Sequence, residues 1–194
     1  MKAKQIIISG HYYYGGCSEI ENNVTFEFSQ MLHNELDKQI QGVTFPILVE
    51  TKNLQKFKVS GPDSMKNLSD FVKECNTDIN LDLIIDIHTN ASEVTTNNGT
   101  ETFVSPKTSS KNRNFATNVN TLICDTLKTF NRGVKNSNQS QYRKLAVLDD
   151  TNAPAILIEL FYANNNSDLE KYNANKKLLS EKLTELIINH LKQL

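Results

Sequence analysis

The sequence predicts a single α/β domain, whose twisted, mostly parallel (mixed) sheet of about six strands carries helices on both faces. Two observations predict this fold class. Short apolar runs, which are typical of buried strands, alternate along the chain with longer segments of helical periodicity. The 194 residues contain neither an internal repeat nor a low-complexity linker, and this length suffices for one sizeable core. We therefore expect one domain over residues 1–194.

The first half of the chain supplies three predicted strands and two predicted helices. Strands are expected at 4–9, 43–49 and 81–87, and helices at 21–36 and 63–75. The second helix has Asp63 or Ser64 as its expected N-cap. The run at 81–87 is almost continuously apolar, which indicates a strand that is buried on both faces.

The second half continues the alternation. Strands are expected at 101–104, 145–148 and 153–160, and helices from Ser109 or Ser110 to about 130 and from Ser167-Asp168 onward, with a break near 173–175. The segments at 89–100 and 131–141 are rich in asparagine, threonine and serine. Their composition predicts loops within the domain.

Composition and charge exclude several classes of function. Hydrophobic residues make up 38% and charged residues 22%, as in ordinary soluble domains. A net charge of −1 offers no basic field, so we expect neither nucleic acid nor a membrane surface as a partner. The N-terminal apolar stretch is too short for a signal peptide, and no run reaches the roughly 18 residues of a membrane span. We therefore expect synthesis in the cytoplasm.

The three cysteines form no C-x-x-C pair, and an odd number cannot all pair within one chain, which favours a reducing compartment. Cys75 and Cys124 lie in helical patterns and are predicted to pack as small hydrophobes. Cys17 follows the first strand, where it is either a neighbour of a metal site, a reactive thiol or neither.

Two histidines and two carboxylates fall at one edge of the predicted sheet. His11 and His88 follow predicted strands, Glu159 ends another, and Glu21 opens the first helix. Sites in open α/β sheets gather at the carboxyl ends of the strands. Each residue alone has a structural interpretation, such as a glutamate that complements the helix dipole. Glu159 is the least easily explained in this way, because a carboxylate after a buried strand is costly unless it is paired or binds a metal.

Together the four residues match the requirements of a catalytic zinc centre. Two imidazoles and one carboxylate are usual zinc ligands, with water in the fourth position. His11, Glu21 and His88 would be the ligands, and Glu159 would be the base that takes the proton of the water. No compact H-E-x-x-H signature is present, so spacing alone leaves this site a hypothesis. The two remaining histidines lie in helical patterns and are predicted to be structural: His33 and His190.

Five segments, running in order from residue 5 to about residue 172, are similar to one known family. They read IIISGH, ENNVTFEFSQMLHNEL, DLIIDIHTNAS, GTETFV, and NRGVK followed by LAVLDDTNAPAILIELFYANNNSDLEKY. The chain thereby resembles the zinc-dependent N-acetylmuramoyl-L-alanine amidases of the type-3 class, which cleave bacterial peptidoglycan. The resemblance implies Zn²⁺ held by His11, Glu21 and His88, with Glu159 as the catalytic acid/base. It also implies the amide between N-acetylmuramic acid and L-alanine as the bond that is cut.

The chain departs from the family in two places. After His11 the family usually has two glycines and a longer loop, whereas this chain has Tyr12–Tyr14 and a short loop. Glu19 is therefore an alternative to Glu21 as the metal carboxylate. Where the family has Leu-Gly-Phe after the catalytic glutamate, this chain has Leu-Phe-Tyr, which looks closer to the amidases of phages that infect clostridia.

Four residues are candidates for contacts with the substrate: Tyr13, Asn90, Arg132 and Lys135. The tyrosine would form one wall of a groove, with simple loop packing as the alternative. The two cations would position a carboxylate of the stem peptide, and both also have an interpretation as plain surface charges.

The resemblance implies a small phage or prophage lysin that reaches the wall after lysis or by non-classical export, without a separate wall-binding domain. Its oligomeric state is open, and a monomer is compatible with the sequence. Two alternatives remain: another zinc hydrolase that cuts the stem peptide, and a non-catalytic wall-binding module.

Overall fold

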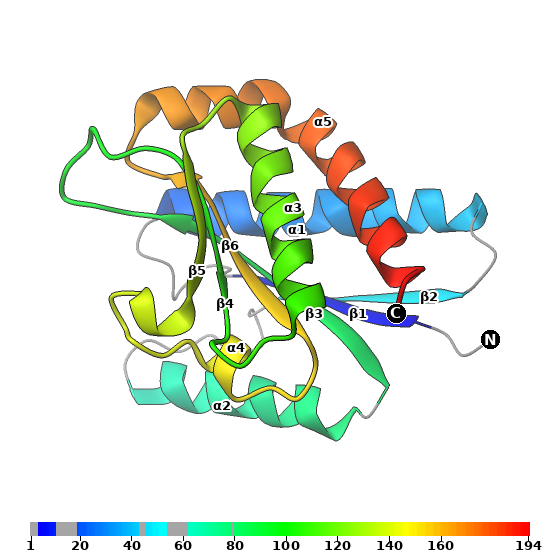
Figure 1. The fold of residues 1–194 in the computed structure, drawn as a ribbon. Helices are drawn as coiled ribbons and strands as arrows, with labels where there is room; N and C mark the ends of the chain where they lie inside the picture. The colour runs from blue at the N-terminus through cyan, green and yellow to red at the C-terminus, as the bar shows by residue number, and fades with distance from the viewer. Residues whose placement is uncertain (1–3, 11–18, 43–45, 54–61, 79) are drawn as a thin grey trace.

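The computed structural model describes residues 4–10, 19–42, 46–53, 62–78 and 80–194 (Figure 1). Within these residues, six strands form one sheet in the order β2-β1-β3-β6-β4-β5. The strands are β1 Lys4–Gly10, β2 Ile47–Asn53, β3 Leu81–Asn90, β4 Thr100–Val104, β5 Asn131–Asn136 and β6 Ala155–Tyr162. Neighbouring strands run parallel except β4 and β6, which are antiparallel. The predicted class, a mixed and mostly parallel sheet in an α/β domain, is confirmed.

Helices cover both faces of this sheet (Figure 1). They are α1 Glu19–Gln39, α2 Pro62–Thr77, α3 Ser110–Leu127, α4 Ala146–Asp149 and α5 Asn166–Leu191. The long helices α1, α3 and α5 pack on one face, and their apolar side chains join the larger buried cluster. The helices α2 and α4 lie on the other face over a smaller cluster. No helix in the described part of the chain is both long enough and apolar enough to cross a membrane.

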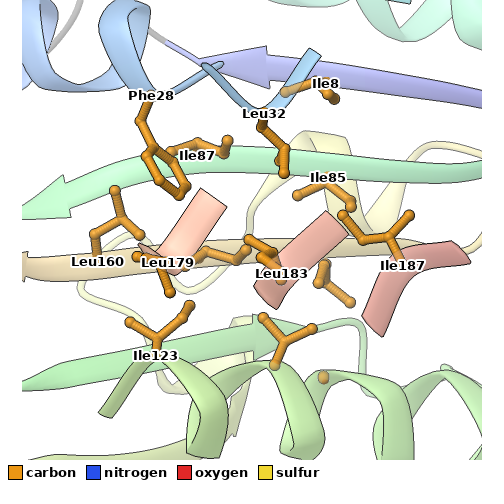
Figure 2. Close-up of a cluster of buried hydrophobic side chains, with 14 of the residues drawn as sticks. Ile8, Phe28, Leu32, Ile85, Ile87, Ile123, Leu160, Leu179, Leu183 and Ile187 are labelled. Carbon is orange, nitrogen blue, oxygen red and sulfur yellow. The ribbon is translucent and has the colours of Figure 1, made fainter. Parts of the chain in front are cut away.

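Alternation along β3 decides which side chains face which layer. Leu83, Ile85 and Ile87 point into the larger cluster, between α1 and α5, as Figure 2 shows for the two isoleucines. Ile84 belongs to the smaller cluster on the opposite face. Successive side chains of a strand alternate between faces, so Asp86 and His88 share the face of Ile84. The strand is therefore buried on both faces, as predicted, and Asp86 and His88 lie on the α2 side.

Two predicted elements differ from the structure. The segment 145–148 is not extended, because Asp149 accepts hydrogen bonds from Leu145 N and Ser137 Oγ and so holds the short helix α4. The predicted loop at 131–141 contains the edge strand β5, which pairs in parallel with β4. No apolar run marks β5, because its residues are exposed or only half-buried. The total of about six strands was right, although one of its members was wrong.

Other boundaries shift by a few residues. The predicted break at 173–175 is absent, because α5 is continuous and buries Tyr172 and Leu179 on either side of those residues. β2 begins at Ile47, and residues 43–45 of the predicted strand lie outside the described residues. Cys75 and Cys124 are buried, as predicted for small hydrophobes.

Candidate functional site

The polar residues of three neighbouring strands form one row across the sheet. His88 of β3 is paired in register with Glu159 of β6, and Glu159 is paired with Glu101 of β4. Side chains of directly paired residues point to the same face and lie close together. β3 and β6 are parallel, and these positions lie in the second halves of both strands. The row therefore lies near the edge at which α/β sheets carry their sites.

Glu21 reaches this row from the first turn of α1. It is buried, with 4% of its surface exposed, whereas Glu19 is exposed. Glu21 Oε1 lies 3.4 Å from His88 Nδ1 and accepts a hydrogen bond from Thr89 N at 3.4 Å. Of the two glutamates considered for the metal carboxylate, Glu21 is the one that the fold places against a predicted ligand.

Asp86 is a member of the site that the sequence interpretation missed. Its Oδ2 lies 2.9 Å from His88 Nε2, and its Oδ1 accepts a hydrogen bond of 2.7 Å from Ser9 Oγ. The signal was present in the segment Ile85-Asp86-Ile87-His88, because a carboxylate two residues before a histidine shares its face of a strand.

His88 thus has a carboxylate at each ring nitrogen. Burial lowers the pKa of the imidazole, but the charge of Asp86 and the hydrogen bonds with Asp86 and Glu21 outweigh burial and raise that pKa well above its ordinary value. The metal-free site therefore favours a positive charge between Glu21 and Asp86. A bound divalent cation would supply that charge, with release of a proton from the ring.

Among the carboxylates of the site, Glu159 is the one whose negative charge its surroundings stabilise least. Its Oε2 atom is buried and has no hydrogen-bond partner among the described residues. Burial raises the pKa of Glu159 to about 8; the charge of His88 opposes this rise, and the carboxylates of Glu21, Glu101 and Asp86 add to it. A carboxyl group that exchanges its proton near neutral pH is suited to general acid–base catalysis.

Glu101 gathers three of the predicted substrate-binding residues around one carboxylate, which we call the Glu101 cluster. Asn90 Nδ2 donates to Glu101 Oε1 at 2.7 Å, and Arg132 Nε donates to Oε2 at 3.2 Å. Lys135 Nζ pairs with the same Oε2. Two cations face one carboxylate, so among these four residues one positive charge is left over. The resemblance pointed to the GTETFV segment but assigned Glu101 no role.

Two predicted site residues, His11 and Tyr13, lie outside the described residues, as does Cys17. Among the residues that are described, no group of three His, Cys, Asp or Glu side chains is arranged to hold a metal ion. The described part of the predicted metal centre is thus the pair His88 and Glu21. The histidines predicted to be structural lie elsewhere: His33 pairs with Asp37 on α1, and His190 stacks on Phe115.

Comparisons with known proteins agree with the family that the five sequence segments resemble. The model of the Amidase_3 family, described as N-acetylmuramoyl-L-alanine amidase, matches residues 6–193. The chain is similar in structure to an N-acetylmuramoyl-L-alanine amidase from Clostridium difficile 630, with a TM-score of 0.75 and 23% identity over 98% of this chain and 97% of that one. The search of curated proteins found no match.

Two further solved structures share the fold. The catalytic domain of the CD27L endolysin, which targets Clostridia difficile, has a TM-score of 0.67 and 24% identity over 98% of this chain and 97% of that one. The catalytic domain of CwlV, an amidase from Bacillus (Paenibacillus) polymyxa, has a TM-score of 0.69 and 17% identity over 97% and 98% of the two chains. At these identities the likeness concerns the fold.

Proposed function

The chain belongs to the N-acetylmuramoyl-L-alanine amidase family over nearly its whole length, and from this premise we propose that it is a zinc-dependent peptidoglycan hydrolase. The bond cut would be the amide that joins the lactyl group of N-acetylmuramic acid to L-alanine of the stem peptide. One observation carries the zinc assignment: the predicted ligand atoms His88 Nδ1 and Glu21 Oε1 lie 3.4 Å apart, next to Glu159, which is paired in register with His88.

The spacing of the two described ligands supports zinc. Two donors at tetrahedral positions, each about 2.0–2.2 Å from zinc, lie about 3.4 Å apart. His88 Nδ1 and Glu21 Oε1 are 3.4 Å apart, which matches that separation. We propose His11 as the third ligand, because the sequence places it at the end of β1, the strand next to β3.

Glu159 would carry the proton transfers. When bound, zinc supplies Lewis-acid polarisation of the scissile carbonyl and of the attacking water. Glu159 takes a proton from the water as the new C–O bond forms at the carbonyl carbon. It returns that proton to the alanine nitrogen as the C–N bond breaks, leaving a lactyl carboxylate and a free amine. Because Oε2 lacks a partner among the described residues, this atom can accept and release the proton without breaking a hydrogen bond there.

Metal removal tests this proposal directly. We expect the purified protein to contain about one zinc per chain, to lose wall-lytic activity with a chelator and to regain it when zinc is added. Mass spectrometry of digested sacculi should find muramic acid without its peptide and peptides with a new N-terminal L-alanine. Cleavage within the stem peptide would instead identify a peptidase, and binding without any cleavage would identify a wall-binding module.

Substrate contacts are proposed for Tyr13 and for the Glu101 cluster. The positive charge left over on Arg132 and Lys135 suits a carboxylate of the stem peptide. Asn90, which follows His88 by two residues on β3, would align the peptide. Tyr13 would pack against a sugar ring.

The cluster makes a kinetic prediction. Replacing Lys135 by Ala leaves Glu101 with Arg132 as its one cationic partner among the described residues, and we expect KM for a muramoyl-peptide substrate to rise about tenfold, with a smaller change in kcat. Lys182 on the exposed side of α5 offers a control, and Lys182→Ala should leave both constants unchanged. A fall in kcat with KM unchanged would contradict a binding role for Lys135.

The biological setting remains a proposal as well. The similarity to the catalytic domain of an endolysin supports a lytic enzyme of phage or prophage origin that acts on the wall after its release from the cell. Lysis of intact cells by protein added from outside, compared with digestion of isolated walls, tests whether the enzyme reaches its substrate unaided.

A further inference from the structure

The carboxylate of Asp86 is held from two strands. Asp86 and Ser9 are paired in register between β3 and β1, and Ser9 Oγ donates to Asp86 Oδ1 at 2.7 Å. Asp86 Oδ2 lies 2.9 Å from Nε2 of His88, two residues further along β3. Ser9 and Asp86 are 1% and 4% exposed. The acid is therefore fixed in one orientation against one nitrogen of the imidazole, out of solvent.

The other nitrogen of the same ring faces Glu21. A neutral imidazole carries one N–H and one lone pair, and a metal ion binds through the lone pair. A carboxylate within hydrogen-bond distance of Nε2 favours the tautomer with its proton on that atom. In that tautomer the lone pair belongs to Nδ1, which lies 3.4 Å from Glu21 Oε1.

We propose that Asp86 is a positioning residue, which selects the Nε2–H tautomer of His88 and thereby aims Nδ1 at the position between His88 and Glu21. This inference rests on the zinc site of the proposed function and adds a residue that the family resemblance did not assign. Histidines that bind metals generally donate their second ring N–H to such a partner, and loss of the partner weakens metal binding about 10- to 100-fold. Ser9 extends the chain of hydrogen bonds by one member, because it fixes Asp86 as Asp86 fixes His88.

The same strand contains a matched control. Asp82 lies near the opposite end of β3 and also bridges to β1, where it accepts from Lys4 Nζ at 3.3 Å and Gln5 N at 2.9 Å. No hydrogen bond or ion pair between Asp82 and His88 occurs in the structure as described. If Asp86 served only to join β1 to β3, Asp86→Ala should change zinc affinity and the tautomer of His88 no more than Asp82→Ala does.

The experiment measures zinc affinity and the tautomer of His88 in the full chain. Competition against a chromophoric chelator should give Asp86→Ala a zinc dissociation constant about 10- to 100-fold above that of the unmodified protein, with a smaller rise for Ser9→Ala and none for Asp82→Ala. In alkaline buffer, where the ring is neutral, long-range ¹H–¹⁵N correlation spectra should place the His88 proton on Nε2. Asp86→Ala should shift this population toward Nδ1–H, and Asp82→Ala should not.

The possible results separate the two proposals. An unmodified protein that binds no zinc would refute the metal-dependent function, and this inference with it. Zinc binding that is equally tight in the unmodified protein and in Asp86→Ala would overturn this inference alone. If Asp86→Ala does not fold, the tautomer in the unmodified protein decides the question, and a proton on Nδ1 would contradict the proposal. Ser9→Ala, a milder change, then gives the affinity comparison.

Discussion

Glu159→Gln is expected to lower the amidase rate by about 10²- to 10⁴-fold, the range that general acid–base catalysis contributes. Glutamine has nearly the same size and shape as glutamate, but its amide cannot take the proton of the attacking water. Burial raises the pKa of Glu159 to about 8, which makes the carboxyl group suitable for this proton transfer. A glutamine amide at the same place has no group that gains or loses a proton near neutral pH. The rate is measured as new amino groups released from purified sacculi.

Zinc content and fold are the controls for this variant. Glu159→Gln should still contain about one zinc per chain, because the proposed ligands are His11, Glu21 and His88. Its thermal stability should not fall, since a neutral amide at a buried site needs less solvation than a carboxylate. Glu185→Gln, on the exposed side of α5, should digest sacculi at the normal rate. Full activity in Glu159→Gln would remove Glu159 from the mechanism.

The parts of the fold that were predictable from sequence are those that are buried on both sides. The apolar runs in β3 and β6 and the helical periodicity of α1 carry strong local signals, because the core itself imposes them. β5 was missed for the opposite reason. It lies at the edge of the sheet, its residues are exposed or half-buried, and it is defined by pairing with residues of β4 that lie 31 or 32 positions earlier in the chain.

The residues of the candidate site also divide into those that could be predicted from sequence and those that could not. Glu21, His88 and Glu159 could be predicted because each occupies a recognisable place at a strand end or in the first turn of a helix. The partners of these residues could not be read in the same way. Whether Glu101 lies beside Glu159 depends on the register of an antiparallel pair, and whether Asp86 meets Ser9 depends on the register of a parallel one. A single sequence does not determine register between strands that are distant in the chain.

The Glu101 cluster also changes the meaning of the predicted substrate contacts. Asn90, Arg132 and Lys135 were selected as separate substrate contacts, but the fold assembles them around one buried carboxylate. Arg132 also donates to Asn98 O at 3.2 Å and lies over the ring of Tyr162. These contacts hold Arg132 in place, which would lower the entropic cost of binding a substrate there. A substitution in this cluster is therefore expected to affect neighbouring members as well as the substrate.

His88→Ala is expected to have the second large effect and to act on metal and activity together. The change removes one of the three proposed ligands, so the zinc that is retained after dialysis should fall from about one per chain to near zero. Zinc supplies several kcal/mol of transition-state stabilisation, and each 1.36 kcal/mol is tenfold, so the amidase rate should fall by at least about 10³-fold. Metal analysis by mass spectrometry and amine release from sacculi measure the two effects.

His33→Ala is the matched control: that histidine pairs with Asp37 on α1, away from the row of site residues, and its loss should change neither quantity. Glu159→Gln and His88→Ala therefore differ in a diagnostic way, because the first is expected to keep zinc without activity and the second to lose both. A His88→Ala variant that kept its zinc and digested sacculi would contradict the metal centre proposed for this edge of the sheet.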